Sequence, residues 1–282
     1  MKKHLYLILI ILISVFFSQS SFSAVTNATA NGGTACAATG AMMTDDSDCR
    51  ATPTEFSIQI YEMGLCSSHP YGDKTEIDID LSTCTKTYSD TSPVAVDIAA
   101  AIGTTLLLTG TSTPPAEGTY GYPYMVIDKT LEVSGSFTNT PEGGSATTYY
   151  SAANNSISTS AADFASSTED LLNFGGANCE SGYIGSAVTG GTMDGFITNT
   201  SFSRSETSDV TDEACDKNGR LVAVMSLNAP IVVTSDTIAV IFKFILTDFG
   251  STFSDGDDAG VAPDSDGFGS APFSGYFTIL NR

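Results

Sequence analysis

The densest group of potential metal ligands is an acidic stretch near the C-terminus. The segment SDGDDAGVAPDSDG, residues 254–267, holds five aspartates. Counted from Asp255, it partly matches a twelve-residue calcium loop, with Asp257 at position 3 and Asp266 at position 12. Ala259 stands where a third oxygen ligand is expected, so the pattern is not that of an EF-hand. Two interpretations stay open: a weak calcium site of Asp255, Asp257 and Asp266, or an acidic turn between strands.

Histidine content restricts the catalytic chemistry. His4 lies in an N-terminal segment predicted to be removed, which leaves His69 as the one imidazole of the mature chain. One histidine cannot supply a three-histidine zinc site or an H-E-x-x-H metalloprotease. A Ser-His-Asp triad would have to use His69. That residue precedes a proline in CSSHPYGD, just after Cys66, and is predicted to lie in an exposed loop.

All six cysteines follow the N-terminal segment, and an even number in an exported chain is typical of disulfides. We predict sequential pairing, because it closes the shortest loops. The predicted pairs are Cys36–Cys49, Cys66–Cys84 and Cys179–Cys215. Zinc binding is the competing interpretation, but no two cysteines stand at C-x₂₋₄-C spacing.

The N-terminus has the three parts of a secretory signal peptide. Lys2 and Lys3 are followed by an apolar run over residues 5–17 and by small residues that predict cleavage after Ser23. The apolar run is shorter than the roughly 18 residues that a transmembrane helix needs. The mature chain, from residue 24, is expected to be secreted, extracellular or on the cell surface, with the periplasm as the alternative. We expect no membrane insertion after signal removal.

Charge excludes one large class of partner. Removal of the signal leaves 9 basic and 32 acidic residues, a net charge of −23. Nucleic acids and anionic lipids are bound through lysine and arginine, so this chain is expected to repel both.

Strand-like alternation runs through most of the mature chain, and no long segment has helical periodicity. In TEFSIQIYEM, Phe56, Ile58 and Ile60 alternate with polar residues, as in a half-buried strand. KTEIDIDLST predicts a second strand with Ile77, Ile79 and Leu81 inward. Its acidic row of Glu76, Asp78 and Asp80 suits a solvated face better than a cation site, because same-face neighbours are about 7 Å apart.

Further strands are predicted in four later segments. In YMVIDKTLEVSGSF, Met125, Ile127, Leu131, Val133 and Phe137 share one side, and Lys129 interrupts it. MDGFITNTSF and LVAVMSLNAPIVV follow. DTIAVIFKFILTDF is apolar on both faces and is predicted to lie in the middle of the structure. PFSGYFTIL predicts the last strand.

These patterns predict an all-β fold, an antiparallel β-sandwich of the transthyretin-like or Ig-like Greek-key kind, with long polar loops and disulfides. An irregular stapled segment over 24–53 precedes a β-sandwich domain over 54–282. A polar Ser/Thr-rich insertion at about 138–170 is either a surface loop or a linker between two β halves.

Two segments, ATPTEFSIQIYEMGLCSS and PAEGTYGYPYMVIDKTLEVSGSF, resemble uncharacterised secreted β-sandwich proteins of marine bacteria. The Gly118–Tyr120 turn also resembles that of transthyretin-like (prealbumin-like) domains. The resemblance covers roughly residues 51–137 and implies an extracellular sandwich. It brings no catalytic residues.

The leading functional hypothesis is a non-enzymatic structural or interaction protein of the cell surface, an adhesin-like module or a subunit of an extracellular filament or layer. Its partners would be copies of itself or other surface proteins. The alternative is a module that binds a glycan or another small ligand, with or without calcium, through Tyr149 and Tyr150 or through Tyr120, Tyr122 and Tyr124. A hydrolase that uses two carboxylates is a third hypothesis.

Overall fold

The computed structural model describes ten segments of the chain, to which all structural statements below refer. They are residues 11–12, 34–39, 48–74, 76–140, 143–171, 183–188, 190–204, 219–254, 267–271 and 274–282. Within them the fold is all-β and almost wholly antiparallel, with two short 3₁₀ turns (Ala153–Asn155 and Ala161–Asp163) and one parallel strand pair. The all-β prediction is confirmed. The strands contain β-branched and aromatic residues whose alternation matches the pleat.

The largest sheet has seven strands, and both of its faces are covered. In order they are β16 (Tyr183–Val188), β17 (Gly191–Thr198), β18 (Arg220–Leu227), β11 (Tyr122–Asp128), β5 (Ile60–Cys66), β6 (Cys84–Ser89) and β9 (Thr111–Ser112). On β11, Met125 and Ile127 join the main core, whereas Tyr124 and Val126 join a second cluster on the opposite face. The predicted alternation is therefore correct, but the second face is buried as well.

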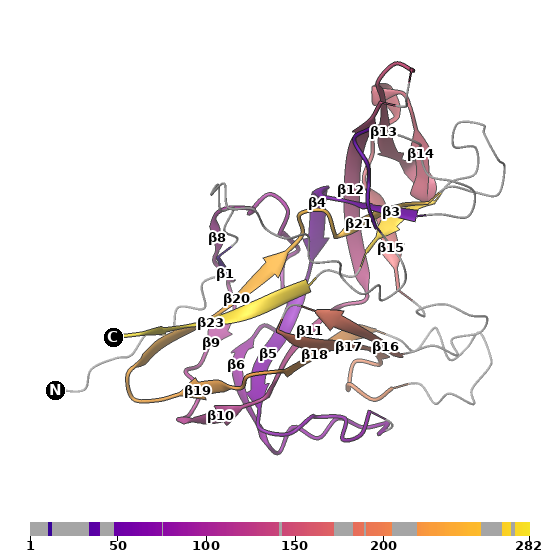
Figure 1. Ribbon diagram of the computed structural model, residues 1–282. Coiled ribbons are helices and arrows are strands. Elements are labelled where there is room, and N and C mark those ends of the chain that lie inside the picture. The colour runs from indigo at the N-terminus through magenta and orange to yellow at the C-terminus, as the bar shows by residue number, and fades with distance from the viewer. Residues whose placement is uncertain are drawn as a thin grey trace.

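A second sheet of six strands projects away from the first (Figure 1). It consists of β14 (Ser156–Ser158), β13 (Thr147–Ala152), β12 (Thr130–Asn139), β4 (Pro53–Ile58) and β7 (Val96–Asp97), with β15 (Ser167–Asp170) paired to β12. The polar segment at 138–170 thus contains strands. Its threonines pair across strands, as Thr138 and Thr148 do through hydroxyls 2.8 Å apart.

The two sheets are joined where two bent strands cross between them. The chain passes from β4 to β5 at Gln59 and from β11 to β12 at Lys129. The amide of Asp128 donates to the carbonyl of Gln59 over 2.9 Å, which ties the two crossings together. Lys129, which interrupts the predicted apolar side, marks this corner.

Smaller strand pairs complete the fold. β2 (Thr34–Ala35), β3 (Asp48–Ala51), β21 (Ser251–Ser254) and β22 (Phe268–Ser270) form a four-stranded sheet, and β10 (Gly118–Tyr120) pairs with β19 (Ile231–Val233). β1 (Ile11–Leu12) pairs with β8 (Thr105–Leu106) and lies within the predicted signal peptide, so nothing below depends on it.

β20 (Thr237–Ile245) and β23 (Ser274–Asn281) form a pair whose apolar side chains enter the main core. Phe242, Phe244 and Leu246 are at most 4 % exposed there. They share that core with Phe56, Ile58 and Ile60 of the bent strands. β20 is buried as predicted, although its described strand partner is β23 alone.

One predicted strand is wrong. Residues 76–83 form bends and a turn in place of a strand, and Ile77 is 41 % exposed. Ile79 and Leu81 pack at the margin of the second cluster. The Cys66–Cys84 bond closes the loop between β5 and β6, residues 67–83. This loop covers one face of the seven-stranded sheet, and its backbone follows that face instead of forming a strand.

Candidate functional site

The acidic stretch near the C-terminus falls outside the described residues. Asp255, Asp257 and Asp266 all lie in the gap at 255–266, so the calcium site stays a prediction. In the described segments, no three His, Cys, Asp or Glu side chains gather in a group that could hold a metal ion.

Two of the three predicted disulfides are confirmed. Cys36 is bonded to Cys49, and Cys66 to Cys84. Cys66 and Cys84 face each other in the β5–β6 ladder, so their bond closes the 67–83 loop at its base. Cys179 and Cys215 lie outside the described residues.

His69 is buried, which corrects the prediction of an exposed loop histidine. Its side chain is 7 % exposed. Nδ1 accepts a hydrogen bond from the amide of Tyr71 over 3.1 Å, so the proton of the neutral ring belongs on Nε2. Nε2 lies 3.5 Å from Oδ2 of Asp194, whose side chain is 1 % exposed. The histidine is buried because β17, far away in the sequence, brings this carboxylate beneath the loop.

Asp194 is the centre of a polar cluster that we call the Asp194 cluster: His69, Lys74, Tyr183 and Asp194. Oδ1 of Asp194 receives hydrogen bonds from Lys74 Nζ over 2.9 Å and from the Tyr183 hydroxyl over 2.8 Å. Oδ2 and His69 Nε2 face each other but have no hydrogen-bond partner of ordinary geometry. Lys74 reaches the cluster from the 67–83 loop, and Tyr183 from the edge strand β16.

The electrostatics of the cluster favour an ion pair. Burial by itself would raise the pKa of Asp194, but the nearby His69 ring and the hydrogen bonds from Lys74 and Tyr183 outweigh it and hold that pKa below its usual value. The hydrogen bond to Asp194 raises the pKa of Lys74. Burial raises the pKa of the Tyr183 hydroxyl. The carboxylate is therefore charged, the ammonium is charged, and the phenol is neutral. In these protonation states, the contacts of Asp194 with Lys74 and Tyr183 stabilise the packing of the 67–83 loop on the seven-stranded sheet.

The loop is also held by groups that the sequence did not single out. Lys74 has a φ of 74°, a left-handed conformation that is uncommon outside glycine. Arg204 donates to the carbonyl of Lys74 over 2.5 Å, and its guanidinium lies 5.0 Å from the centre of the Phe196 ring. The hydroxyl of Tyr71, a residue with no exposed surface, donates to the carbonyl of Phe202 over 2.9 Å. Contacts on several sides therefore stabilise the strained backbone conformation at Lys74.

A second buried carboxylate lies on the same sheet. Glu62 is 7 % exposed and accepts from the Tyr124 hydroxyl over 2.6 Å. Its other oxygen is paired with Lys86 Nζ at 2.5 Å. Burial is the main cause that raises the pKa of Tyr124, and its hydrogen bond to Glu62 adds to it. Both oxygens of Glu62 are occupied, as expected for a structural group.

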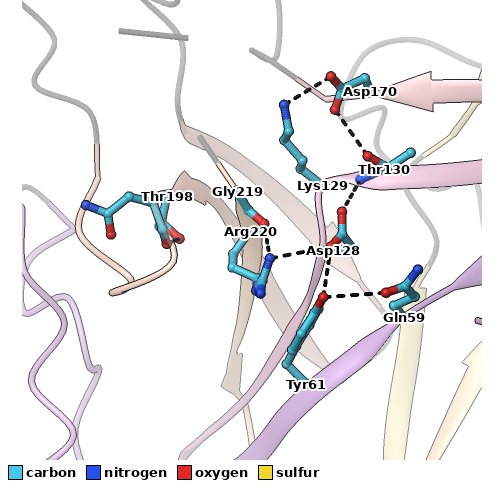
Figure 2. Close-up of polar contacts among 10 residues, drawn as sticks. Gln59, Tyr61, Asp128, Lys129, Thr130, Asp170, Thr198, Gly219 and Arg220 are labelled. Carbon is cyan, nitrogen blue, oxygen red and sulfur yellow. Dashed lines mark hydrogen bonds and ion pairs between the residues drawn. The ribbon is translucent and has the colours of Figure 1, made fainter. Parts of the chain in front are cut away.

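Figure 2 shows a third polar network, at the corner between the two sheets. Asp128 Oδ2 lies 3.4 Å from Arg220 and accepts from the Tyr61 hydroxyl over 3.2 Å. The guanidinium of Arg220 lies 3.6 Å from the centre of the Tyr61 ring, a cation–π contact. On the other side of the corner, Lys129 pairs with Asp170 at 3.0 Å. These groups fix the bend.

The tyrosines considered as a glycan platform pack in the protein. Tyr120, Tyr124 and Tyr149 are 7, 4 and 5 % exposed. Tyr122 and Tyr150 are half-buried. A flat stacking surface of two or three exposed rings is therefore absent from these five residues.

Strand β23 presents an open edge. It pairs with β20 along its length, and no other described strand pairs with it. Between Ser274 and Asn281 it has no charged residue and no proline. Ile279 and Leu280 are 37 and 47 % exposed. Natural proteins usually protect such an edge with charges, proline or a covering segment.

Comparisons with protein-family models, curated proteins and solved structures give no match. Among the described residues, no helix has the length and hydrophobicity required to cross a bilayer.

One signal in the sequence pointed to the Asp194 cluster. In TMDGFIT, the period of two places Asp194 on the same face as Phe196, and a carboxylate in register with an apolar residue indicates a buried charge. Its partners could not be found this way, because Lys74 and His69 are more than 100 residues distant in the chain.

Proposed function

We propose that the protein is an exported, non-enzymatic β-sandwich protein that assembles with copies of itself through the open edge of β23. It would act as a structural subunit or interaction module of the cell surface. The observation that carries the proposal is the uncharged, partly apolar edge between Ser274 and Asn281.

Edge-to-edge pairing is the association that this strand favours. Unpaired backbone N–H and C=O groups of an edge strand form hydrogen bonds with a strand of another molecule, and exposed apolar side chains add buried area. A chain with a strongly negative net charge repels its copies, so contact is most favourable where neither partner carries charge. The stretch from Ser274 to Asn281 fulfils that condition.

The state of His69 supports a role without catalysis. It is the one imidazole of the mature chain, its Nδ1 is bonded to a backbone amide, and its Nε2 faces a buried carboxylate. A general base must reach a proton of the substrate. A side chain that is 7 % exposed and lies within a disulfide-closed loop suits stability better.

Different residues support export and an oxidising compartment. The signal-peptide pattern predicts secretion, and disulfides such as Cys36–Cys49 and Cys66–Cys84 persist outside the cytosol. Immunofluorescence of intact cells with an antibody to the mature chain tests surface retention. Protein found only in the culture medium as a monomer contradicts a surface role.

The assembly proposal is tested by sedimentation velocity of the mature chain, residues 24–282, over a wide range of concentration. The expected result is reversible self-association. Leu280→Lys combined with Ile279→Lys places two like charges on the edge and should give a monomer. The matched control is Val232→Lys on β19, because Val232 and Leu280 are both 47 % exposed. A wild-type protein that stays monomeric at every concentration overturns the proposal.

A further inference from the structure

Three sheets line an open cavity of about 470 Å³ that the proposed assembly does not use. Its walls come from β16–β18 of the seven-stranded sheet, from β4, β12 and β15 at the corner, and from β3, β21 and β22 of the four-stranded sheet. Strands β20 and β23 take no part in it. The volume falls in the range of about 300–1,000 Å³ that is usual for small-molecule sites.

Most of the lining is apolar. Side chains from the three sheets converge on the cavity, among them Leu131, Leu171, Ile184, Val188, Met193 and Leu221. Such a lining binds the hydrocarbon part of a ligand by removing it from water. The cavity opens to the surface, so a polar end of the ligand is able to stay near its mouth.

The polar part of the lining contains one arginine and two carboxylates, Arg50, Asp48 and Glu169. Arg50 is already engaged: it donates to Thr252 Oγ1 over 2.5 Å and lies 3.3 Å from Asp48 Oδ2. Burial lowers the pKa of the Arg50 guanidinium, which its neighbour Asp48 partly offsets. The arginine charge is therefore matched within the wall.

Glu169 is placed differently. Its Oε2 accepts the amide of Ser270 over 2.6 Å, and no group of the described residues donates to its Oε1. Glu169 lines the cavity and is partly buried. A carboxylate in this position attracts a hydrogen-bond donor that carries positive charge.

We propose that this cavity binds a small amphipathic amine, with the apolar body against β16–β18 and the ammonium group on Glu169. With Arg50 paired to Asp48, the unmatched charge of the wall is that of Glu169, and it is negative. A carboxylate ligand would meet repulsion from Glu169 and from the acidic chain as a whole. A neutral alcohol would form a hydrogen bond with Glu169 but would gain no ionic attraction.

The test uses three probes with one apolar body and different ends: 4-phenylbutylamine, 4-phenylbutanol and 4-phenylbutyrate. Each is titrated calorimetrically into the mature chain, residues 24–282, at pH 7 and moderate ionic strength. The expected result is saturable one-to-one binding of the amine, about 10-fold or more tighter than that of the alcohol, and no binding of the carboxylate.

Two variants separate the charge from the cavity. Glu169→Gln keeps the side-chain volume and an oxygen that accepts from the Ser270 amide. It should weaken the binding of the amine about 10-fold and leave the affinity for the alcohol unchanged. Gly269→Leu places a bulky side chain in the cavity beside Glu169, and its Cβ would lie 3.6 Å from the carboxyl group, an ordinary contact distance. It should abolish binding of both amine and alcohol.

The matched control is Glu132→Gln, which removes one exposed carboxylate on β12 outside the cavity and should leave all affinities unchanged. If Glu132→Gln weakens amine binding as much as Glu169→Gln does, the amine binds to the acidic surface in general, and the proposal is overturned. The absence of saturable amine binding at millimolar concentration also overturns it. Ile279 and Leu280 lie outside the cavity, so the double lysine variant of the assembly test should still bind the amine. Amine binding by this variant as a monomer would show that the two proposals stand or fall independently.

Discussion

Nε2 of His69 lies 3.5 Å from Oδ2 of Asp194, and both side chains are almost fully buried. The two residues are 125 positions apart in the sequence, and their contact fastens the loop between Cys66 and Cys84 onto the seven-stranded sheet. The pair therefore has a structural consequence that can be measured. The Asp194 cluster joins a strained loop position, Lys74, to an edge strand through one carboxylate.

The first prediction concerns acid stability. The pKa of Asp194 in the folded protein is below its ordinary value, because the nearby His69 ring and the hydrogen bonds from Lys74 and Tyr183 outweigh the opposite effect of burial. The stability that Asp194 contributes is thus complete above the unfolded pKa of about 3.9 and is lost as the pH falls through the lower, folded pKa. Asp194→Asn should show a smaller loss of unfolding free energy below about pH 4 than wild type.

Urea unfolding followed by circular dichroism, at a series of pH values, measures this difference; the chain has no tryptophan for fluorescence. At neutral pH, Asp194→Asn should lower the unfolding free energy by about 2–3 kcal/mol, because it weakens several buried partners at once. Asp170→Asn is the control, since its side chain is 49 % exposed, and should cost about 0–1 kcal/mol. Parallel pH curves for Asp194→Asn and wild type contradict the prediction.

The second prediction concerns close packing at Gly64 on β5. A Cβ at this position would collide with the ring of Tyr124 and lie 2.8 Å from the carbonyl oxygen of Thr85. Gly64→Ala should therefore lower the unfolding free energy by about 1–3 kcal/mol. Gly121→Ala is the matched control, because no atom lies within 4 Å of its added Cβ. It should leave stability unchanged or raise it by up to about 1 kcal/mol. Equal effects of the two substitutions would disprove the packing argument.

The third prediction concerns the corner between the sheets (Figure 2). Arg220 contacts both Asp128 and the ring of Tyr61, so Arg220→Met should lower the unfolding free energy by about 1–2 kcal/mol. Lys129→Met, which breaks a pair with the more exposed Asp170, should cost about 0–1 kcal/mol. Chemical denaturation of both variants gives the comparison. A greater loss in Lys129→Met would place the stabilising contact elsewhere.

The fourth prediction concerns the cysteines. Peptide mapping without reduction should recover the Cys36–Cys49 and Cys66–Cys84 bonds, and the sequence predicts Cys179–Cys215 as the third. Replacement of Cys66 and Cys84 by alanine should lower the unfolding free energy by about 3 kcal/mol, because the bond closes a loop with a sequence separation of 18. A cross-linked peptide that joins Cys179 to any of the first four cysteines contradicts the predicted pairing.

Local patterns predicted much of the fold correctly. The alternation of Phe56, Ile58 and Ile60, the doubly apolar β20 and the last strand all have counterparts in the structure. Short-range disulfides were predictable for the same reason, since nearby cysteines close small loops. The strand predicted through Ile77 is wrong. A period of two only favours a strand locally, and here the contacts of the loop with β17 and residues 199–204 outweigh that preference.

The polar clusters could be predicted much less well. Asp194 carried a signal, because it lies in register with Phe196, but two of its partners, His69 and Lys74, are more than 100 residues away in the chain. His69 looked exposed beside a proline and a glycine-containing turn. Its burial depends on a carboxylate supplied by another strand, and no local pattern encodes that.

The sequence by itself determined the class of this protein: an acidic, disulfide-bonded chain of strands with one histidine outside the predicted signal peptide, because composition and the period of two are local properties. Only the tertiary structure decided where charge is buried, that one edge of β23 has no partner among the described strands, and where three sheets line an open cavity. Those features arise from residues that are distant in the chain and meet only when the strands pair. The stabilising energy comes from contacts between such residues, as between His69 and Asp194, and no single segment of the sequence contains it.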